Sequence, residues 1–152
     1  MNGIKGIDVS EWQGDINWQK VKNAGIKFAM VRTSYGQRSL DKTYIANING
    51  AQAVGINVGA YHYCYAKTVE EAKAEARHFV NTIKPYTLPY PAVLDLEDPS
   101  QANLGKTLLT DMAIAFMEVV KDAGYFPMLY ANKYWLESKL DCNRLKDYDI
   151  WL

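Results

Sequence analysis

Three acidic residues close a short apolar stretch in the second half of the chain. Residues 90–99 read YPAVLDLEDP, so Asp95, Glu97 and Asp98 follow residues that are typical of a buried strand. An unpaired carboxylate is costly to bury, and a fold retains one where it is paired, solvated or used in chemistry. Because side chains alternate along a strand, Asp95 and Glu97 share one face while Leu96 points to the other.

Carboxylates that share a concave site can divide acid and base work between them. They hinder each other's ionisation, which raises the pKa of at least one. A protonated acid beside an ionised one is what glycoside hydrolysis requires. Asp8, near the end of a predicted strand at residues 6–10, is the third candidate. Two other interpretations stay open. Asp95 and Glu97 could accept hydrogen bonds from a helix N-terminus, or the three acids could bind Mg²⁺ or Ca²⁺, although their spacing is not distinctive of a metal site.

The elements that position these acids are strands and helices that alternate along the chain. The patterns predict strands at residues 6–10, 27–34, 57–66, 91–97, 126–132 and 148–152, and helices at 16–25, 43–55, 68–84, 108–124 and 133–140. Strand and helix repeat at intervals of about thirty residues, which indicates βαβ units and a parallel sheet. An open doubly wound sheet and a barrel both fit this order.

The segment after the first predicted strand bears on that choice. It reads DVSEWQGDIN and lacks both the G-x-G-x-x-G and the Walker spacing, so nucleotide binding has no support. Barrels carry their chemistry at the carboxyl ends of strands, where Asp8, Asp95 and Glu97 are predicted to lie. Asp98 stands just before a proline and is predicted to be a turn residue.

The histidines are predicted to be structural. His62 alternates with Tyr61 and Tyr63, so it faces the helices if the two tyrosines face the barrel mouth. His78 lies in the amphipathic helix predicted at 68–84 and is expected at the surface or in the core. No Ser–His–Asp or Cys–His arrangement is evident from the sequence.

Composition narrows the class of protein. The 152 residues suffice for one domain with a hydrophobic core, which we place over residues 1–152. Seventeen basic residues balance seventeen acidic ones, so no overall field favours nucleic acid. No stretch approaches the roughly twenty apolar residues of a membrane span. The start lacks the apolar core of a standard secretory signal peptide.

Four segments together carry a family resemblance. GIDVSEWQGDINWQKVKNAGIKFAMVRTSYG, VGAYHYCYA, AVLDLED and MLYANKYWLESKL occur in this order and closely resemble the family 25 glycoside hydrolases. These are the muramidase-type lysozymes of phage endolysins and bacterial autolysins. The resemblance covers essentially the whole chain and rests on GIDVSxWQGxIxW combined with DLE. It implies an α/β fold, an irregular TIM-like β/α barrel, and cleavage of the β-1,4 bond between N-acetylmuramic acid and N-acetylglucosamine in peptidoglycan.

The resemblance also implies roles for the acids. Matched by position, Glu97 falls on the family's general acid, Asp95 on the partner acid of the same motif, and Asp8 on the acid of the first strand. We expect Asp95 and Asp8 to keep Glu97 protonated and to stabilise positive charge at the anomeric centre. Asp95 could also orient the substrate's N-acetyl group as an internal nucleophile, so retaining, inverting and substrate-assisted mechanisms stay open.

Aromatic residues at strand ends are expected to line the substrate groove. These are Tyr61, Tyr63, Tyr130 and Trp151. An aromatic face stacks on the apolar face of a sugar ring, although core packing is the alternative for each. Arg32, at the end of the second predicted strand, could contact substrate or pair with an acid. We expect no cofactor and no metal.

The chain departs from the family pattern at its end. Family members continue through further strands that close the barrel and supply another aspartate, so we expect a barrel truncated after the sixth strand. An open edge would permit self-association. A catalytically silent carbohydrate-binding fragment and a chitinase-like glycosidase are the alternatives, although the latter expects more spaced aspartates before the glutamate. With no signal peptide visible, we expect action on the cell wall after secretion or phage release.

Overall fold

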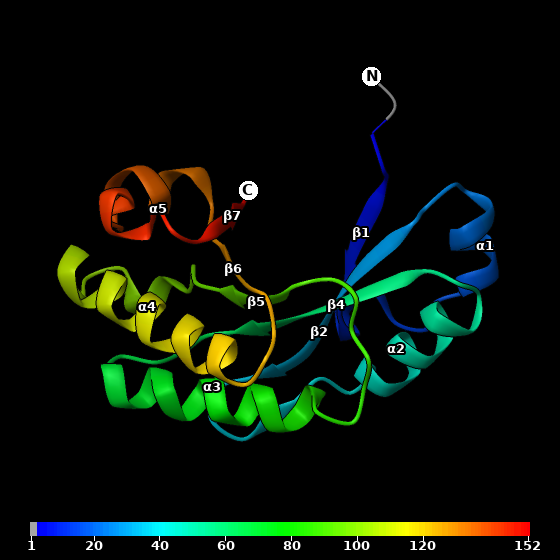
Figure 1. The fold of residues 1–152 in the computed structure, drawn as a ribbon, viewed down its shortest axis with the longest axis horizontal. Coiled ribbons are helices and arrows are strands. Elements are labelled where there is room, and N and C mark those ends of the chain that lie inside the picture. Colours follow the sequence, from blue (N-terminus) through cyan, green and yellow to red (C-terminus); the bar gives the residue numbers. More distant parts are fainter. Residues whose placement is uncertain (1–2) are drawn as a thin grey trace.

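Six parallel strands lie side by side in the order in which they occur along the chain. The computed structural model describes residues 3–152. The strands are β1 (Gly6–Val9), β2 (Phe28–Tyr35), β4 (Asn57–Tyr63), β5 (Ala92–Asp95), β6 (Pro127–Tyr130) and β7 (Asp149–Trp151), and a short β3 (Ser39–Leu40) pairs antiparallel with β2. The sheet curls into a half-barrel (Figure 1). A doubly wound sheet would reverse the strand order partway, so that alternative is wrong.

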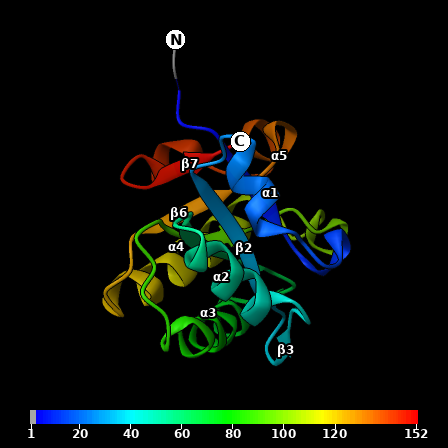
Figure 2. The same cartoon turned by 90° about the vertical axis from the view of Figure 1, so that its right-hand side faces the viewer.

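Helices connect successive parallel strands and cover the outer side of the sheet. They are α1 (Trp18–Asn23), α2 (Tyr44–Ala53), α3 (Val69–Ile83), α4 (Lys106–Asp122) and α5 (Lys133–Ser138), with 3-10 turns η1 (Glu11–Gln13), η2 (Pro99–Gln101) and η3 (Cys142–Leu145). Helices α3 and α4 lie side by side, and α1 and α2 lie near the β1–β2 end of the sheet (Figures 1 and 2). Within residues 3–152, no helix covers the inner, concave side of the half-barrel.

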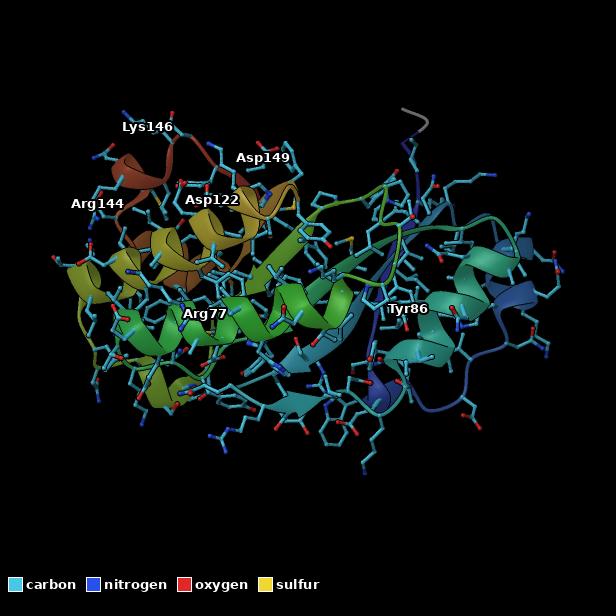
Figure 3. The ribbon with its side chains drawn as sticks, turned by 60° about the horizontal axis from the view of Figure 1, so that its bottom comes forward. Arg77, Tyr86, Asp122, Arg144, Lys146 and Asp149 are labelled. Atoms are coloured by element: carbon cyan, nitrogen blue, oxygen red, sulfur yellow. The ribbon has the colours of Figure 1, made fainter. Side chains whose placement is uncertain are left out.

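The apolar core lies between the sheet and the helices. Phe79 of α3 and Phe116 of α4 are fully buried and stack with ring centroids 5.9 Å apart. They belong to one cluster with Leu94 of β5, and a second cluster lies under α1 and α2. Exposed polar side chains such as Arg77 on α3 and Asp122 on α4 extend from the helix layer (Figure 3).

The strand that carries the acids ends earlier than predicted. The sequence pattern predicts it over residues 91–97, but β5 ends at Asp95, and Glu97 therefore lies in the loop that follows. The loop turns because the Asp98 carboxylate accepts a 3.1 Å hydrogen bond from the Ser100 backbone amide and caps η2. This confirms the prediction of Asp98 as a turn residue. Leu96 is fully buried on the helix side, also as predicted.

The two ends of the sheet remain separate. Strands β1 and β7 are the edges, and within residues 3–152 they do not pair with each other. The described strands thus form an open half-barrel, while the closed TIM-like barrel, its truncation and self-association through the edges stay predictions. None of the helices in the described part of the chain is both long and apolar enough to cross a lipid bilayer.

Candidate active site

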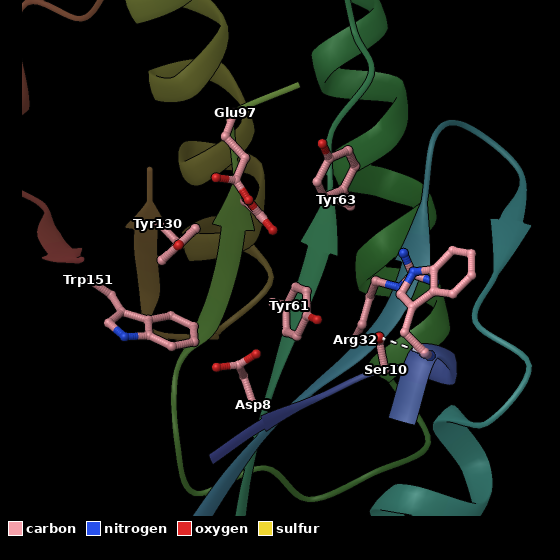
Figure 4. Close-up of a pocket in the computed structure, with 10 residues that line it drawn as sticks. Asp8, Ser10, Arg32, Tyr61, Tyr63, Glu97, Tyr130 and Trp151 are labelled. Atoms are coloured by element: carbon pink, nitrogen blue, oxygen red, sulfur yellow. Dashed lines mark hydrogen bonds between the residues drawn. The ribbon is translucent and has the colours of Figure 1, made fainter. Parts of the chain in front are cut away.

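A pocket of about 250 Å³ opens at the carboxyl ends of the parallel strands (Figure 4). Its lining consists of Asp8, Ser10, Trp12, Arg32, Tyr61, Tyr63, Asp95, Glu97, Tyr130 and Trp151. Every site residue predicted from the sequence is in this list. Ser10 and Trp12 are the lining residues that sequence reasoning missed.

Strand register explains why these side chains meet. Asp95 pairs with Tyr63 on one side and with Tyr130 on the other, and Tyr130 pairs in turn with Trp151. Paired residues in a sheet point to the same face, so these four side chains form one row across β4 to β7. Arg32 pairs with Tyr61 in the adjacent row. The row places an acid between two tyrosines at the pocket wall.

A β-bulge in β2 lets two nearby residues face opposite sides of the sheet. Arg32 pairs with Tyr61, yet Ser34 pairs with His62, so the register shifts by one residue at Thr33. Without the bulge, Arg32 and Ser34 would share a face. With it, Arg32 reaches the pocket while the Ser34 hydroxyl turns toward the helices.

His62 belongs to a buried polar chain behind the sheet. Its Nδ1 lies 2.7 Å from Ser34 Oγ, and its Nε2 lies 2.8 Å from Glu75 Oε1 of α3. Burial lowers the pKa of His62, although Glu75 favours the charged form. All three side chains are buried on the helix side, so this Ser–His–Glu sequence of contacts has no access to a substrate in the pocket. The prediction that His62 faces the helices is confirmed.

The surroundings of Asp95 raise its pKa. Burial raises the pKa of Asp95 to about 9, helped by the charge of Glu97, a hydrogen bond with Glu97 and the charge of Asp8, while Arg32 opposes the shift. A raised pKa favours the protonated form of Asp95 at neutral pH. The expectation that its neighbours keep Glu97 protonated stays a prediction. Burial is the largest cause of the shift at Asp95, which ends its strand and is 7% exposed.

Asp95 also has unused hydrogen-bonding capacity. Its Oδ1 is buried and receives no hydrogen bond from residues 3–152. A buried carboxyl oxygen without a donor is costly, and it is available to a substrate group that enters the pocket. In the same described residues, no cluster of three or more His, Cys, Asp or Glu side chains is placed to hold a metal ion.

Arg32 is held by two acids. Its Nε donates to Asp41 Oδ2 and its Nη2 donates to Glu11 Oε1, both at 2.8 Å. Arg32 thus pairs with acids, one of its two predicted roles, while contact with substrate stays a prediction. Burial acts to raise the pKa of Asp41, but hydrogen bonds from the backbone amides of Glu11 and Thr43, the Thr43 hydroxyl and Arg32 outweigh it and lower that pKa.

The tyrosines of the pocket are protonated hydrogen-bond donors. Burial and nearby carboxylates raise the pKa values of Tyr61, Tyr63 and Tyr130. The Tyr63 hydroxyl donates to Asp98 Oδ1 at 3.0 Å. Tyr130 meets Trp151 edge to face, with ring centroids 4.9 Å apart. The pocket thus combines apolar ring faces with hydroxyl donors, a combination suited to sugars.

Trp12 stands on the one-turn helix η1, immediately after β1. Ser10 caps this turn: its Oγ accepts a 3.3 Å hydrogen bond from the Trp12 amide, drawn as a dashed line in Figure 4. The Trp12 side chain is 81% exposed. The sequence does contain a signal for Trp12: it is a tryptophan in the loop directly after the strand that carries the candidate acid Asp8.

Comparisons with known proteins identify the family of the chain. The model of the family "Glycosyl hydrolases family 25" matches residues 7–152. Lysozyme M1 of Streptomyces globisporus is 38% identical over 105 residues, covering 66% of this chain and 35% of that protein. The autolytic lysozyme of Clostridium acetobutylicum is 26% identical over 151 residues, covering 98% of this chain and 44% of that protein. The chain thus spans less than half the length of these two relatives.

Solved structures give the same picture. A family 25 glycosyl hydrolase from Bacillus anthracis superposes with a TM-score of 0.85 at 28% identity, covering 98% of this chain and 69% of that one. The Cpl-1 endolysin complexed with a peptidoglycan analogue superposes with a TM-score of 0.78 at 26% identity, covering 96% of this chain and 42% of that one. Since the family model matches nearly every residue, the chain belongs to the glycosyl hydrolases of family 25.

Proposed function

We propose that this chain is an N-acetylmuramidase, a peptidoglycan hydrolase that cleaves the β-1,4 bond between N-acetylmuramic acid and N-acetylglucosamine. The observation that carries the proposal is the placement of Asp95, a buried acid with a raised pKa, beside Glu97 in a pocket lined with aromatic residues. The lysozyme relatives and the endolysin bound to a peptidoglycan analogue support the same substrate. The proposed partner is the glycan strand, and the proposed place of action is the cell wall.

Glu97 is the proposed general acid because it is the more exposed member of the pair. The proton of the pair passes through Glu97 to the glycosidic oxygen as the bond to the anomeric carbon breaks. The electrons of that bond remain on the oxygen, which leaves as a hydroxyl group. Asp95 becomes an anion as the proton leaves the pair, so its charge and that of Asp8 stabilise the positive charge at the anomeric carbon.

The second half of the reaction needs a nucleophile at the anomeric carbon. The acetamido oxygen of N-acetylmuramic acid fits this role, since Asp95 can accept a hydrogen bond from the acetamido N–H through its unpartnered Oδ1. Water then opens the cyclic intermediate and its proton returns to the carboxylate pair. Tyr130 and Trp151 supply ring faces for the sugar, and the hydroxyls of Tyr61 and Tyr63 reach its polar edge.

The test identifies which bond breaks. Purified peptidoglycan is incubated with the chain, the new reducing ends are reduced with borohydride, and the acid hydrolysate is analysed for amino sugar alcohols. A muramidase yields muramitol, whereas glucosaminitol would show that the other glycosidic bond is cleaved and would overturn the proposal. Release from chitin oligomers but not from peptidoglycan would favour the chitinase-like alternative. Binding without any release would favour the carbohydrate-binding fragment.

A further inference from the structure

We propose that Trp12 is a second sugar-stacking surface of the pocket and that it receives an uncharged N-acetylglucosamine ring next to the cleaved bond. The inference rests on the proposed muramidase function. Figure 4 shows Ser10 and Arg32 on one side of the pocket and Tyr130 and Trp151 on the other. Since Ser10 caps the turn that carries Trp12, the pocket has an indole at each of these two sides, with the acids between them.

The exposure of Trp12 contrasts with the order of its backbone. At 81% exposed, it is the most exposed of the large hydrophobic side chains in residues 3–152. Yet the Ser10 amide donates to Gln13 Oε1 at 2.6 Å, and the Glu11 amide donates to Asp41 Oδ2 at 3.0 Å. After Trp12, the Gln13 amide donates to the Ser10 carbonyl oxygen at 3.2 Å, so hydrogen bonds fix the backbone on both sides of the indole. A ring face presented on a fixed backbone loses little conformational entropy when a ligand stacks on it.

The charges next to Trp12 indicate which sugar it receives. The guanidinium of Arg32 forms ion pairs with the carboxylates of both Glu11 and Asp41. These three side chains thus have two acidic groups and one basic group. Lys42 reaches Glu11 only at 4.0 Å, and its side chain is 85% exposed. Two of the guanidinium nitrogens are already bonded to acids, so Arg32 is a poor receptor for an anion. This side of the pocket therefore disfavours the lactyl carboxylate of N-acetylmuramic acid and accepts its neutral neighbour, N-acetylglucosamine.

Binding measurements in the Glu97→Gln background test the inference without turnover. The ligand is the neutral trimer of N-acetylglucosamine, and affinity is measured by titration calorimetry. Trp12→Ala is expected to raise Kd about tenfold, and Trp12→Phe, which keeps a ring, to raise it no more than about threefold. Tyr134→Ala is the matched control, because Tyr134 is an exposed aromatic residue that does not line the pocket, and its Kd should stay unchanged.

Indole fluorescence locates the contact. Trp18 and Trp135 are buried, so the emission change on adding the trimer should come from the pocket indoles and should fall sharply in Trp12→Phe. Unchanged affinity in Trp12→Ala would overturn the inference. If wild-type hydrolysis still produced ends that yield muramitol in that case, the proposed function would stand and only the role of Trp12 would be refuted. If the trimer bound to none of the variants, the Trp12 surface would be refuted, and failure of wild-type hydrolysis as well would remove the proposed function.

Discussion

Tyr63 and Asp95 are register partners on β4 and β5, and both side chains line the pocket. Asp95 has a second register partner, Tyr130, on its other side. The acid is thereby enclosed between two tyrosines at the end of its strand, and burial is the main cause of its raised pKa. Sheet register thus places Asp95 in the buried position that raises its pKa.

Replacing Asp95 by asparagine is expected to stabilise the fold while impairing hydrolysis. The folded-state pKa of about 9 lies above the ordinary value of 3.8, so between these pH values the folded chain holds a proton that the unfolded chain releases. Stability conferred by this group is present below about pH 4 and is lost as pH rises toward 9. The neutral asparagine side chain would carry no such cost, so we expect a gain on the order of 2 kcal/mol at pH 7 and almost none at pH 4.

Urea unfolding at both pH values measures this difference. A variant that is less stable than the wild type at pH 7 would show that Asp95 is ionised and well paired in the folded chain. Asp15→Asn serves as the control, because Asp15 is exposed and lies outside the pocket lining. It should unfold like the wild type at either pH.

Removing the Asp41 carboxylate should destabilise the Arg32 side of the pocket. Asp41 is 1% exposed and accepts hydrogen bonds from Arg32, the Glu11 amide and Thr43. Asp41→Ala leaves the guanidinium of Arg32 and two backbone amides without this acceptor, at an expected cost of about 3 kcal/mol. Chemical denaturation at pH 7 measures the loss, and a cost no larger than that of an exposed Asp→Ala change would contradict it.

The stability that the Asp41 carboxylate confers should depend on pH in the opposite direction to that of Asp95. Its folded-state pKa is lowered below 3.8, so its contribution is present above the unfolded value and disappears as pH falls through the folded value. The difference in stability between the wild type and Asp41→Ala should therefore shrink below about pH 4. A difference that stays constant as the pH is lowered to about 2 would rule out an ionised, hydrogen-bonded Asp41.

His62 should make the fold sensitive to mild acid. Burial lowers the pKa of His62 below 6.5, so the unfolded chain binds this proton first, and stability falls as pH drops below 6.5. In the Asp95→Asn background, which removes the opposing slope, we expect a loss of about 1 kcal/mol between about pH 7 and pH 5.5. His62→Gln should abolish that slope and His78→Gln should keep it. Retention of the slope in His62→Gln would assign it to another group.

Several features of the site follow from local sequence patterns. Alternation along a strand was sufficient to assign Tyr61 and Tyr63 to the pocket and His62 to the helix side. The order of strands and helices was sufficient to bring Asp8 to the same edge of the sheet as Asp95. These predictions succeed because they depend only on strand periodicity and on parallel strands ending at one edge.

Other features depend on tertiary structure. The bulge at Thr33 adds one residue to β2 without changing its apolar pattern, so the contact between Ser34 and His62 could not be predicted. The hydrogen bond between Arg32 of β2 and Asp41 could not be predicted either, because Asp41 lies in a loop outside the strand pattern. The burial of Asp95 also depends on tertiary structure, because it is set by where β5 ends, and the protonation of Glu97 stays a prediction.

The central claim is that Glu97 delivers the proton that breaks the glycosidic bond. The direct measurement is the rate of reducing-end release from purified peptidoglycan by the wild type, Glu97→Gln and the control Glu137→Gln, whose carboxylate lies exposed on α5. Loss of a general acid should lower the rate by a factor of about 10² to 10⁴, with the control unchanged. Wild-type release that persists in Glu97→Gln would contradict the account.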